Sequence, residues 1–328
     1  MRTTWVGLML LGMGAVAAAQ DSATSSFNLL DGDRLPTILA AAEADEQGDP
    51  SRQAAGQEKK DQTQPGEKYT TRDQEMIIRA GRPKEEALVG PYQQSEWTQH
   101  RRFSTTRIYV QQPPGGVEFE HWIEIRVPKP GGKAQEVRMR EEFEFGLGGR
   151  FQLDLYMLTE WTQDRQSVAN TFEWRGWSGE IRWALADWNV IPGNPTLYFE
   201  YIFRNGDENF IEPKLLLGGE FCAGLHWGVN FVYERELGKH SERTEELKLT
   251  GGLSYTVVDQ KLGFGPAFEW AYEAEYSGGT AGRSREFHFG PSLQYRPIPK
   301  AHINIEPLWG LTGESKRLKM FLIFGWDF

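Results

Sequence analysis

The stretch Val117–Val127, VEFEHWIEIRV, alternates between two kinds of side chain. Its odd positions are mostly apolar and its even positions are mostly charged. Successive side chains of a β-strand point to opposite faces of the sheet, so this period of two predicts a strand with one apolar and one polar face. Its length also matches the roughly 9–11 residues that a tilted strand needs to cross a bilayer.

The same alternation recurs to the end of the chain and predicts twelve strands. Their expected spans are 117–127, 136–147, 151–160, 178–188, 196–203, 209–219, 225–236, 244–256, 261–275, 284–296, 301–311 and 316–328. The connections at 147–150 and 296–300 are tight, whereas those at 162–177, 204–208, 236–243 and 276–283 are polar and mostly longer. This pattern predicts an all-β fold, a transmembrane antiparallel up-and-down β-barrel of about 12 strands. A large soluble barrel or sandwich is the alternative.

Composition excludes several functional classes. The 328 residues include 46 acidic and 36 basic side chains, for a net charge of −10, which argues against general binding of nucleic acid. A single Cys allows no internal disulfide and no Cys-rich metal site. We therefore expect no metal, no cofactor and no nucleic-acid partner.

The N-terminal part differs in composition from the rest. Arg2, an apolar run and then Ala17-Ala18-Ala19 predict a signal peptide over residues 1–19. Residues 20–100 are poor in aromatic side chains and predict a largely disordered periplasmic segment, which could bind a periplasmic partner. The barrel is expected over 101–328. The stretch Phe103–Val110 also resembles a strand, and a thirteenth strand would break the even count, so it is placed outside the wall or inside the lumen.

The chain ends in Lys319–Phe328, KMFLIFGWDF, with Phe324, Trp326 and Phe328 on one face. This end resembles the C-terminal assembly signal of Gram-negative outer-membrane β-barrel proteins, both porin-like and transporter-like. The family pattern also has a Gly five residues before the end and a polar residue seven before it, where this chain has Ile323 and Phe321. The resemblance implies an outer-membrane location with a periplasmic N-terminal segment. It also implies outer-membrane lipid and the barrel assembly machinery as partners.

The polar faces of the strands should line the interior, where carboxylates outnumber basic side chains. A twelve-strand barrel has a backbone radius of roughly 12 Å, which leaves at most a narrow channel between the side chains. An acidic lumen concentrates cations and repels anions. The predicted pore-lining residues are Glu118, Glu120, Glu124, Arg126, Arg138, Arg140, Glu142, Glu144, Asp154, Glu200, Glu269, Glu273 and Arg296.

Three functions remain open. The first is a narrow channel for small polar or cationic solutes. The second is a non-conducting structural or scaffolding barrel, in which Arg138 and Arg140 pair with the carboxylates of 118–124 on the adjacent strand. The third, a lipid-hydrolysing barrel, is disfavoured because His288 and Ser292 are too far apart along one strand and His121 has no nucleophile beside it. We predict no catalytic residues and no enzymatic activity.

Overall fold

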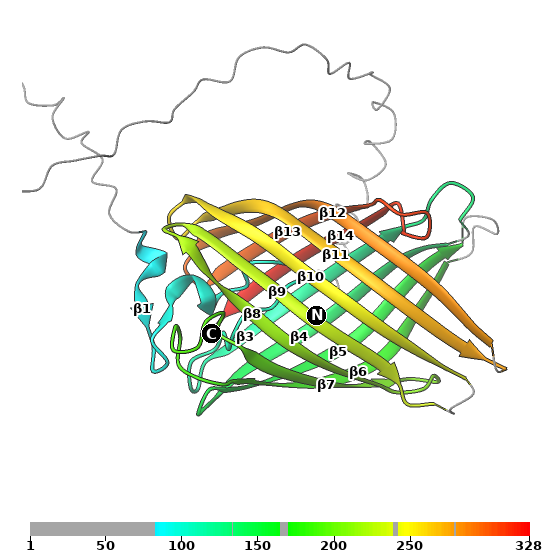
Figure 1. The fold of residues 1–328 in the computed structure, drawn as a ribbon, viewed down its shortest axis with the longest axis horizontal. Helices are drawn as coiled ribbons and strands as arrows, with labels where there is room; N and C mark the ends of the chain where they lie inside the picture. The colour runs from blue at the N-terminus through cyan, green and yellow to red at the C-terminus, as the bar shows by residue number, and fades with distance from the viewer. Residues whose placement is uncertain (1–82, 133, 165–169, 239–241, 279) are drawn as a thin grey trace, which may run out of the picture. The chain divides into compact units, whose positions relative to one another are not determined.

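A computed structural model describes residues 83–328 except 133, 165–169, 239–241 and 279. The expected signal peptide and most of the expected N-terminal segment lie outside the described residues. Twelve antiparallel strands close into a barrel, which confirms the predicted fold class (Figure 1). The strands are β3 Val117–Val127, β4 Ala134–Gly148, β5 Phe151–Asp164, β6 Asn170–Ala184, β7 Thr196–Arg204, β8 Phe210–Cys222, β9 Leu225–Glu236, β10 Glu242–Val258, β11 Leu262–Ser277, β12 Thr280–Ile298, β13 Ala301–Gly310 and β14 Leu318–Asp327.

The barrel closes where its last strand pairs with its first. Leu322 on β14 lies opposite Ile123 on β3, and the Phe328 N–H donates to the Val117 carbonyl at 3.0 Å. We call this end of the barrel, which holds the C-terminus, the Phe328 end, and the other end the opposite end. The connections at the opposite end include β3–β4, β5–β6 and β7–β8.

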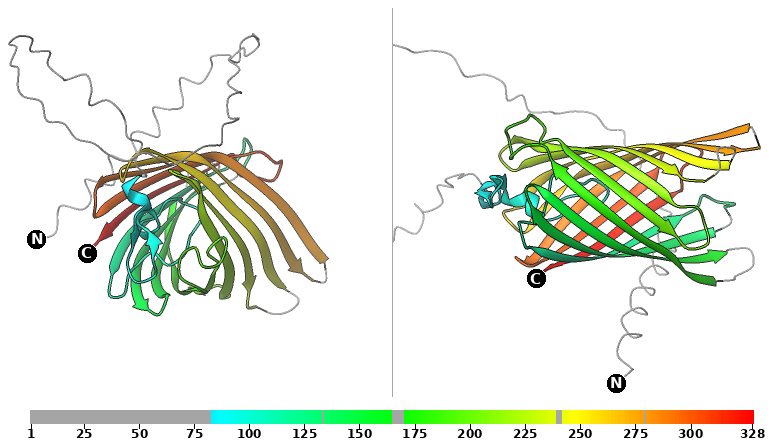
Figure 2. Two further views of the ribbon diagram at one scale, coloured as in Figure 1. Left: turned by 60° about the vertical axis from the view of Figure 1, so that its left-hand side comes forward. Right: turned by 90° about the horizontal axis from the view of Figure 1, so that it is seen from below.

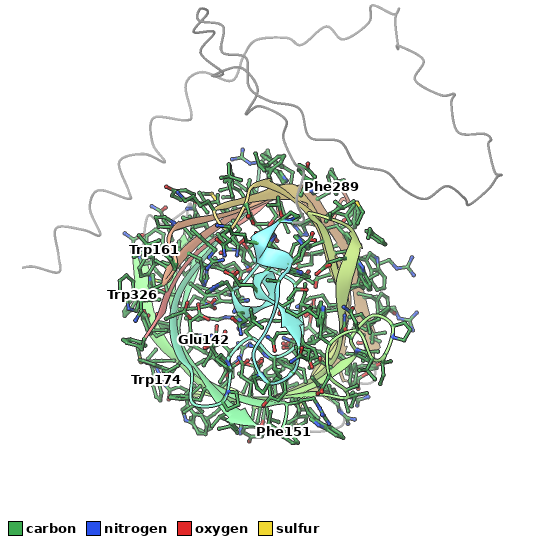
Figure 3. All side chains as sticks on the ribbon, turned by 90° about the vertical axis from the view of Figure 1, so that its left-hand side faces the viewer. Glu142, Phe151, Trp161, Trp174, Phe289 and Trp326 are labelled. Atoms are coloured by element: carbon green, nitrogen blue, oxygen red, sulfur yellow. The ribbon has the colours of Figure 1, made fainter. Side chains whose placement is uncertain are left out.

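The outer surface is apolar and aromatic. Phe151, Trp161, Trp174, Phe289 and Trp326 point outward around the circumference (Figure 3). The residues of the expected assembly signal share this face, with Phe324 42%, Trp326 37% and Phe328 71% exposed. Such a surface suits contact with lipid. Within the described part of the chain, no helix is long and apolar enough to span a membrane.

The neighbouring strands β5 and β6 differ from their expected spans at the connection between them. Residues 162–177 were expected as a loop, but β5 continues to Asp164 and β6 begins at Asn170. The register shifts at a bulge beside Gly176, which has a φ of 139°. Before the bulge the outward-facing residues have even numbers, such as Trp174, and after it they have odd numbers, such as Trp177. The alternation in the sequence is therefore interrupted within the strand.

A separate segment fills the barrel from the Phe328 end. Residues 83–116, here called the plug, contain a 3-10 helix Lys84–Glu86, a short hairpin of β1 Leu88–Val89 and β2 Gln94–Ser95, and a second 3-10 helix Glu96–Gln99. The chain then continues without a strand through the lumen, where it lies inside the ring of wall strands (Figure 2, Figure 3). Of the two placements expected for Phe103–Val110, the structure therefore shows the lumen. The division expected at residue 100 falls inside the plug.

The wall has small residues where the plug approaches it most closely. A Cβ atom on Gly218 or Gly252 would lie 2.7 Å from a side-chain carbon of Ile108 or Phe103, respectively. Gly228 and Gly263 lie against the plug in the same way. These glycines lie on four consecutive strands, β8–β11. Side chains there would occupy the space that the plug fills.

A substitution at one of these glycines should loosen the plug. In Gly252→Val, the added carbons meet the ring of Phe103, which is 0% exposed, so overpacking should cost about 1–3 kcal/mol. We expect trypsin to cleave the folded variant faster after the buried Arg102 and Arg107. Mass spectrometry of the fragments measures the cleavage rate. Gly282→Val is the matched control, because its Cβ would meet only the Glu275 carbonyl at 3.8 Å. Equal cleavage rates in the two variants would contradict the close-packing argument.

Candidate functional site: the acidic lumen and its plug

Acidic side chains lie directly opposite one another on strand after strand. Asp327 faces Glu118 across the β14–β3 pair, and Glu118 faces Glu144 across β3–β4. The register continues this pattern around the wall, with one acid on each strand from β14 and β3 through β11. This set, the acidic row, is Asp327, Glu118, Glu144, Asp154, Glu180, Glu200, Glu212, Glu234, Glu246 and Glu273.

The acidic row climbs along the barrel because it follows the hydrogen-bonding direction of tilted strands. With strands about 4.8 Å apart and tilted by about 40°, the row advances about 28 Å along the barrel axis. This is close to the roughly 30 Å of a bilayer's hydrocarbon core. Exposure changes along the row, from 0% at Glu118 and 5% at Glu200 to an exposed Glu273 near the opposite end. The row therefore leads from a filled region into an open one.

Six buried carboxylates gather in the filled region. Glu120 and Glu142, also opposite each other, join four members of the acidic row. This carboxylate cluster consists of Glu118, Glu120, Glu142, Glu144, Asp154 and Glu180, each at most 1% exposed. Two basic side chains of the wall bond to it: Arg182 pairs with Asp154 and Glu180, and His302 Nε2 lies 2.8 Å from a Glu118 oxygen. The wall thus supplies fewer cations than carboxylates.

The plug supplies two further cations. The Arg101 guanidinium donates from Nε to Glu120 at 2.7 Å and from Nη2 to the other Glu120 oxygen at 2.5 Å. Its carbon Cζ lies 4.1 Å from the centre of the Trp122 ring, a cation–π contact. The Trp122 Nε1–H in turn donates to Glu120 and Glu142 at 2.9 and 2.8 Å, which fixes both carboxylates beside the guanidinium.

Arg107 occupies the other side of the carboxylate cluster. Its Nη1 donates to Glu144 at 2.6 Å, and its Nη2 donates to Glu142 and to the Tyr156 hydroxyl. Burial alone would lower the pKa of Arg107, but the nearby Glu142, Tyr156 and Glu144 raise it well above its usual value. For Arg102, which meets only Glu85 among the acids, burial prevails and the pKa is lowered. Arg107 therefore stays charged where it is needed to balance the cluster.

Inward side chains also satisfy the plug's main chain. Asn230 accepts from the Arg107 N–H and donates to the Arg107 carbonyl, both at 2.7 Å. Gln152 accepts from the N–H groups of Gln111 and Gln112. Asn304 donates to the Arg101 carbonyl at 3.1 Å. Because buried main-chain groups need partners, these amides let an irregular segment lie inside the barrel.

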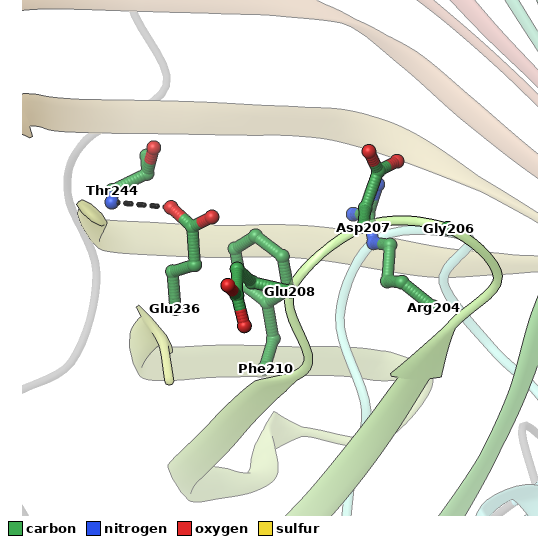
Figure 4. A pocket seen from close by; sticks show the side chains of 7 residues that line it. All are labelled: Arg204, Gly206, Asp207, Glu208, Phe210, Glu236 and Thr244. Atoms are coloured by element: carbon green, nitrogen blue, oxygen red, sulfur yellow. Dashed lines mark hydrogen bonds between the residues drawn. The ribbon is translucent and has the colours of Figure 1, made fainter. Parts of the chain in front are cut away.

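The remaining half of the lumen balances its charge within the wall. Lys214 pairs with Glu212 at 2.6 Å, Lys248 with Glu246 at 3.1 Å and Lys319 with Glu269 at 2.7 Å. At the opposite end a pocket of about 500 Å³ opens between strands β7–β10 (Figure 4). Three of its seven lining residues are acidic; the lining is Arg204, Gly206, Asp207, Glu208, Phe210, Glu236 and Thr244.

The structure places the expected pore-lining residues as follows. Those buried inside the barrel are Glu118, Glu120, Glu124, Glu142, Glu144, Asp154, Glu200, Glu269 and Arg296. Those partly exposed are Arg126, Arg138 and Arg140, and Glu273 is exposed near the opposite end. That these residues line a solute path stays a prediction.

The expected pairing of Arg138 and Arg140 with the carboxylates at 118–124 is met only in part: Arg138 lies directly opposite Glu124 in the ladder, but its closest ion pairs are not with that carboxylate. Arg138 bonds Glu160 and Glu136 instead. Arg140 lies opposite Trp122 in the ladder, where there is no carboxylate. The register thus sets Glu124 opposite an arginine, whereas Glu118 and Glu120 lie opposite the acids Glu144 and Glu142.

Sequence reasoning missed the residues that balance the cluster. Arg107 stands directly before the apolar run Ile108-Tyr109-Val110, which was a signal that the segment packs against something. Trp122 is an aromatic side chain on the otherwise charged face of β3, which was a second signal.

Other candidate groups are engaged in pairs. Glu118, Glu120 and His302 have ligand atoms close enough for a metal ion, but His302 bonds both carboxylates directly at 2.8 and 3.2 Å. His121 lies on the outer face, where its Nδ1 is 2.8 Å from a Glu141 oxygen.

Loss of a plug arginine should destabilise the folded protein. Arg107→Gln removes the cation closest to Glu142 and Glu144, and the loss of one partner of a buried ion pair costs about 3–5 kcal/mol. The loss should shrink at pH 5 relative to pH 8, because protonation removes the unpaired negative charge. Urea unfolding of the detergent-folded protein at each pH measures the loss of stability and its change with pH. In the control Arg175→Gln, which breaks a partly exposed pair with Asp207, the loss should stay below about 1 kcal/mol. A similar, pH-independent loss in both variants would refute the assignment.

Comparison with known proteins gives likeness in structure alone. No family model and no curated protein sequence matches the chain. The crystal structure of an outer membrane channel from Pseudomonas putida F1 is similar with a TM-score of 0.52 and 11% identity, over 67% of this chain and 98% of that one. The NanC porin is similar with a TM-score of 0.42 and 14% identity, over 65% of this chain and 98% of that one. The fold of this chain is that of the outer-membrane β-barrel proteins.

Proposed function

We propose that the protein is a channel for small polar or cationic solutes in the outer membrane of a Gram-negative cell. The observation that carries the proposal is the acidic row, which offers carboxylates on strand after strand over about the thickness of a bilayer. Closely spaced charges of one sign raise the local concentration of counter-ions in a low-dielectric tunnel. A cation that enters at Glu273 meets further carboxylates at each step inward.

The arrangement described is the closed state of this channel. The plug fills the lumen at the Phe328 end, and its arginines hold the carboxylates that a passing cation would meet. Conduction therefore requires the plug to move. The contacts that resist this movement include apolar packing, in a buried cluster that contains Phe103, Ile108 and Trp188, as well as ionic and polar contacts. The ionic and polar contacts can be exchanged for contacts with solutes or water.

The location and partners follow from the same proposal. The exposed apolar belt faces outer-membrane lipid, and the terminal Phe328 serves the barrel assembly machinery. The Phe328 end then faces the periplasm, so the N-terminal segment before the plug is periplasmic and open to a periplasmic partner. A protein with this function is not an enzyme.

A non-conducting structural barrel is the second candidate. The buried ion pairs between Arg101, Arg107 and the carboxylate cluster favour it, because they give the lumen a filled and well-bonded interior. The two candidates differ in whether the plug leaves its place in the membrane-inserted protein.

Ion selectivity tests the role of the acidic row. In a planar bilayer with a KCl gradient, the full chain should give cation-selective currents. In water, a unit charge about 6 Å from a passing ion is worth about 0.7 kcal/mol, or about a threefold change in local concentration. Glu200→Gln with Glu234→Gln should therefore lower the cation-to-anion permeability ratio about threefold or more. Glu141→Gln, which removes an outward-facing charge, should leave the ratio unchanged. Equal ratios in all three proteins would contradict a path along the row.

A reversible cross-link tests whether the plug must move. Ile108→Cys with Gly218→Cys, in a Cys222→Ser background, joins the plug to β8. The Cγ2 atom of Ile108 lies 2.7 Å from the ideal Cβ of Gly218, so the two Cβ atoms come within the roughly 4 Å that a disulfide spans. We expect the oxidised protein to give no current and the reduced protein to conduct. Equal currents in both states would show a path past the docked plug. Silence in both, from protein shown to be inserted, would favour the structural barrel.

A further inference from the structure

Side chains of the lumen wall bind two guanidinium groups of the plug, those of Arg101 and Arg107. Glu120 accepts hydrogen bonds from both Nε and Nη2 of Arg101, while Trp122 supports the flat face of the same group. Glu142, Glu144 and the Tyr156 hydroxyl bind Arg107. All five wall residues are buried and come from three neighbouring strands, β3, β4 and β5.

We propose that Glu120, Trp122, Glu142, Glu144 and Tyr156 form a binding site for solutes that carry a guanidinium group. Arg101 and Arg107 occupy this site while the plug is docked, and a solute replaces them when it is released. This inference rests on the proposed function, because the solute reaches the site along the lumen.

The shape of the site selects a guanidinium over an ammonium group. A planar fork of N–H donors matches the two oxygens of Glu120, and its flat face matches the indole of Trp122. An ammonium group is a compact charge without that fork or face. The Trp122 Nε1–H holds Glu120 and Glu142 in place without any help from the plug, so the wall site keeps its geometry after the arginines leave.

The plug's own group leaves part of its bonding capacity unused. Arg101 is 2% exposed, and its Nη1 has no hydrogen-bond partner among the described residues. A guanidinium tethered to the main chain cannot turn to satisfy this donor, whereas a free one can. The acidic row also connects the site to the open end, since Glu144 belongs to both.

Binding to an emptied site is the direct test. In the full chain, Arg101→Ala with Arg107→Ala removes both guanidinium groups and leaves the wall intact. We expect calorimetry on the detergent-folded protein to detect L-arginine and to find it bound about tenfold more tightly than L-lysine, as the loss of one charge-assisted hydrogen bond implies. Adding Trp122→Leu should abolish this preference, and the wild-type chain, in which the solute must compete with the docked plug, should bind L-arginine more weakly than the double variant does. Equal affinity for both amino acids, or no binding by the folded double variant, would overturn the proposal.

A second measurement keeps both arginines in place and does not depend on the folding of the double variant. In the Ile108→Cys, Gly218→Cys protein, L-arginine should slow disulfide formation by competing with the plug, and L-lysine should slow it less. Identical rates with and without L-arginine would also overturn the proposal. Because neither measurement requires conduction, binding without current would contradict the channel alone, and current without binding would contradict the site alone.

Discussion

The pairing register of the wall imposes a constraint that the rest of the molecule must meet. It sets carboxylate opposite carboxylate, as in Glu118–Glu144, Glu120–Glu142 and Asp154–Glu180. Like charges directly opposite one another destabilise a sheet. The strands cannot escape by slipping one residue, because that would turn every apolar side chain from the outer surface into the lumen. Compensation must come from side chains that reach the row from elsewhere.

The two halves of the lumen meet this constraint in different ways. Toward the opposite end, neighbours within the wall suffice, as with Lys214 beside Glu212. At the Phe328 end the wall offers Arg182 and His302, and the plug brings the rest. Seating an irregular segment there requires room and bonding partners, which the glycines of β8–β11 and amides such as Asn230 provide. Charge, steric space and hydrogen bonding thus favour the same placement of the plug.

Much of this fold could be predicted from the sequence, because the alternation of apolar and polar side chains is a local property of each strand. The barrel, its strand number and its apolar outer face followed from that period and from the chain end. The bulge at Gly176 was hidden because it shifts the alternation midway through β6. The acidic row was hidden because it depends on register, and one sequence does not state which residues of two strands lie opposite. The plug was hidden for a related reason. Its partners, such as Glu120 and Glu306, lie later in the chain and come into contact with it only in the folded barrel.

In the proposed channel, docking of the plug and uptake of cations would be linked through the carboxylate cluster. With the plug in place, Arg101, Arg107 and Arg182 offset six buried acidic groups. When the plug leaves, two of these three cations leave with it, and Arg182 and His302 remain. Water entering the lumen lowers the cost of the exposed charges, and cations from solution supply the balance. Any cation that binds the emptied cluster therefore favours the undocked state in proportion to its affinity, so the ions that such a lumen attracts would also act on the equilibrium that opens it.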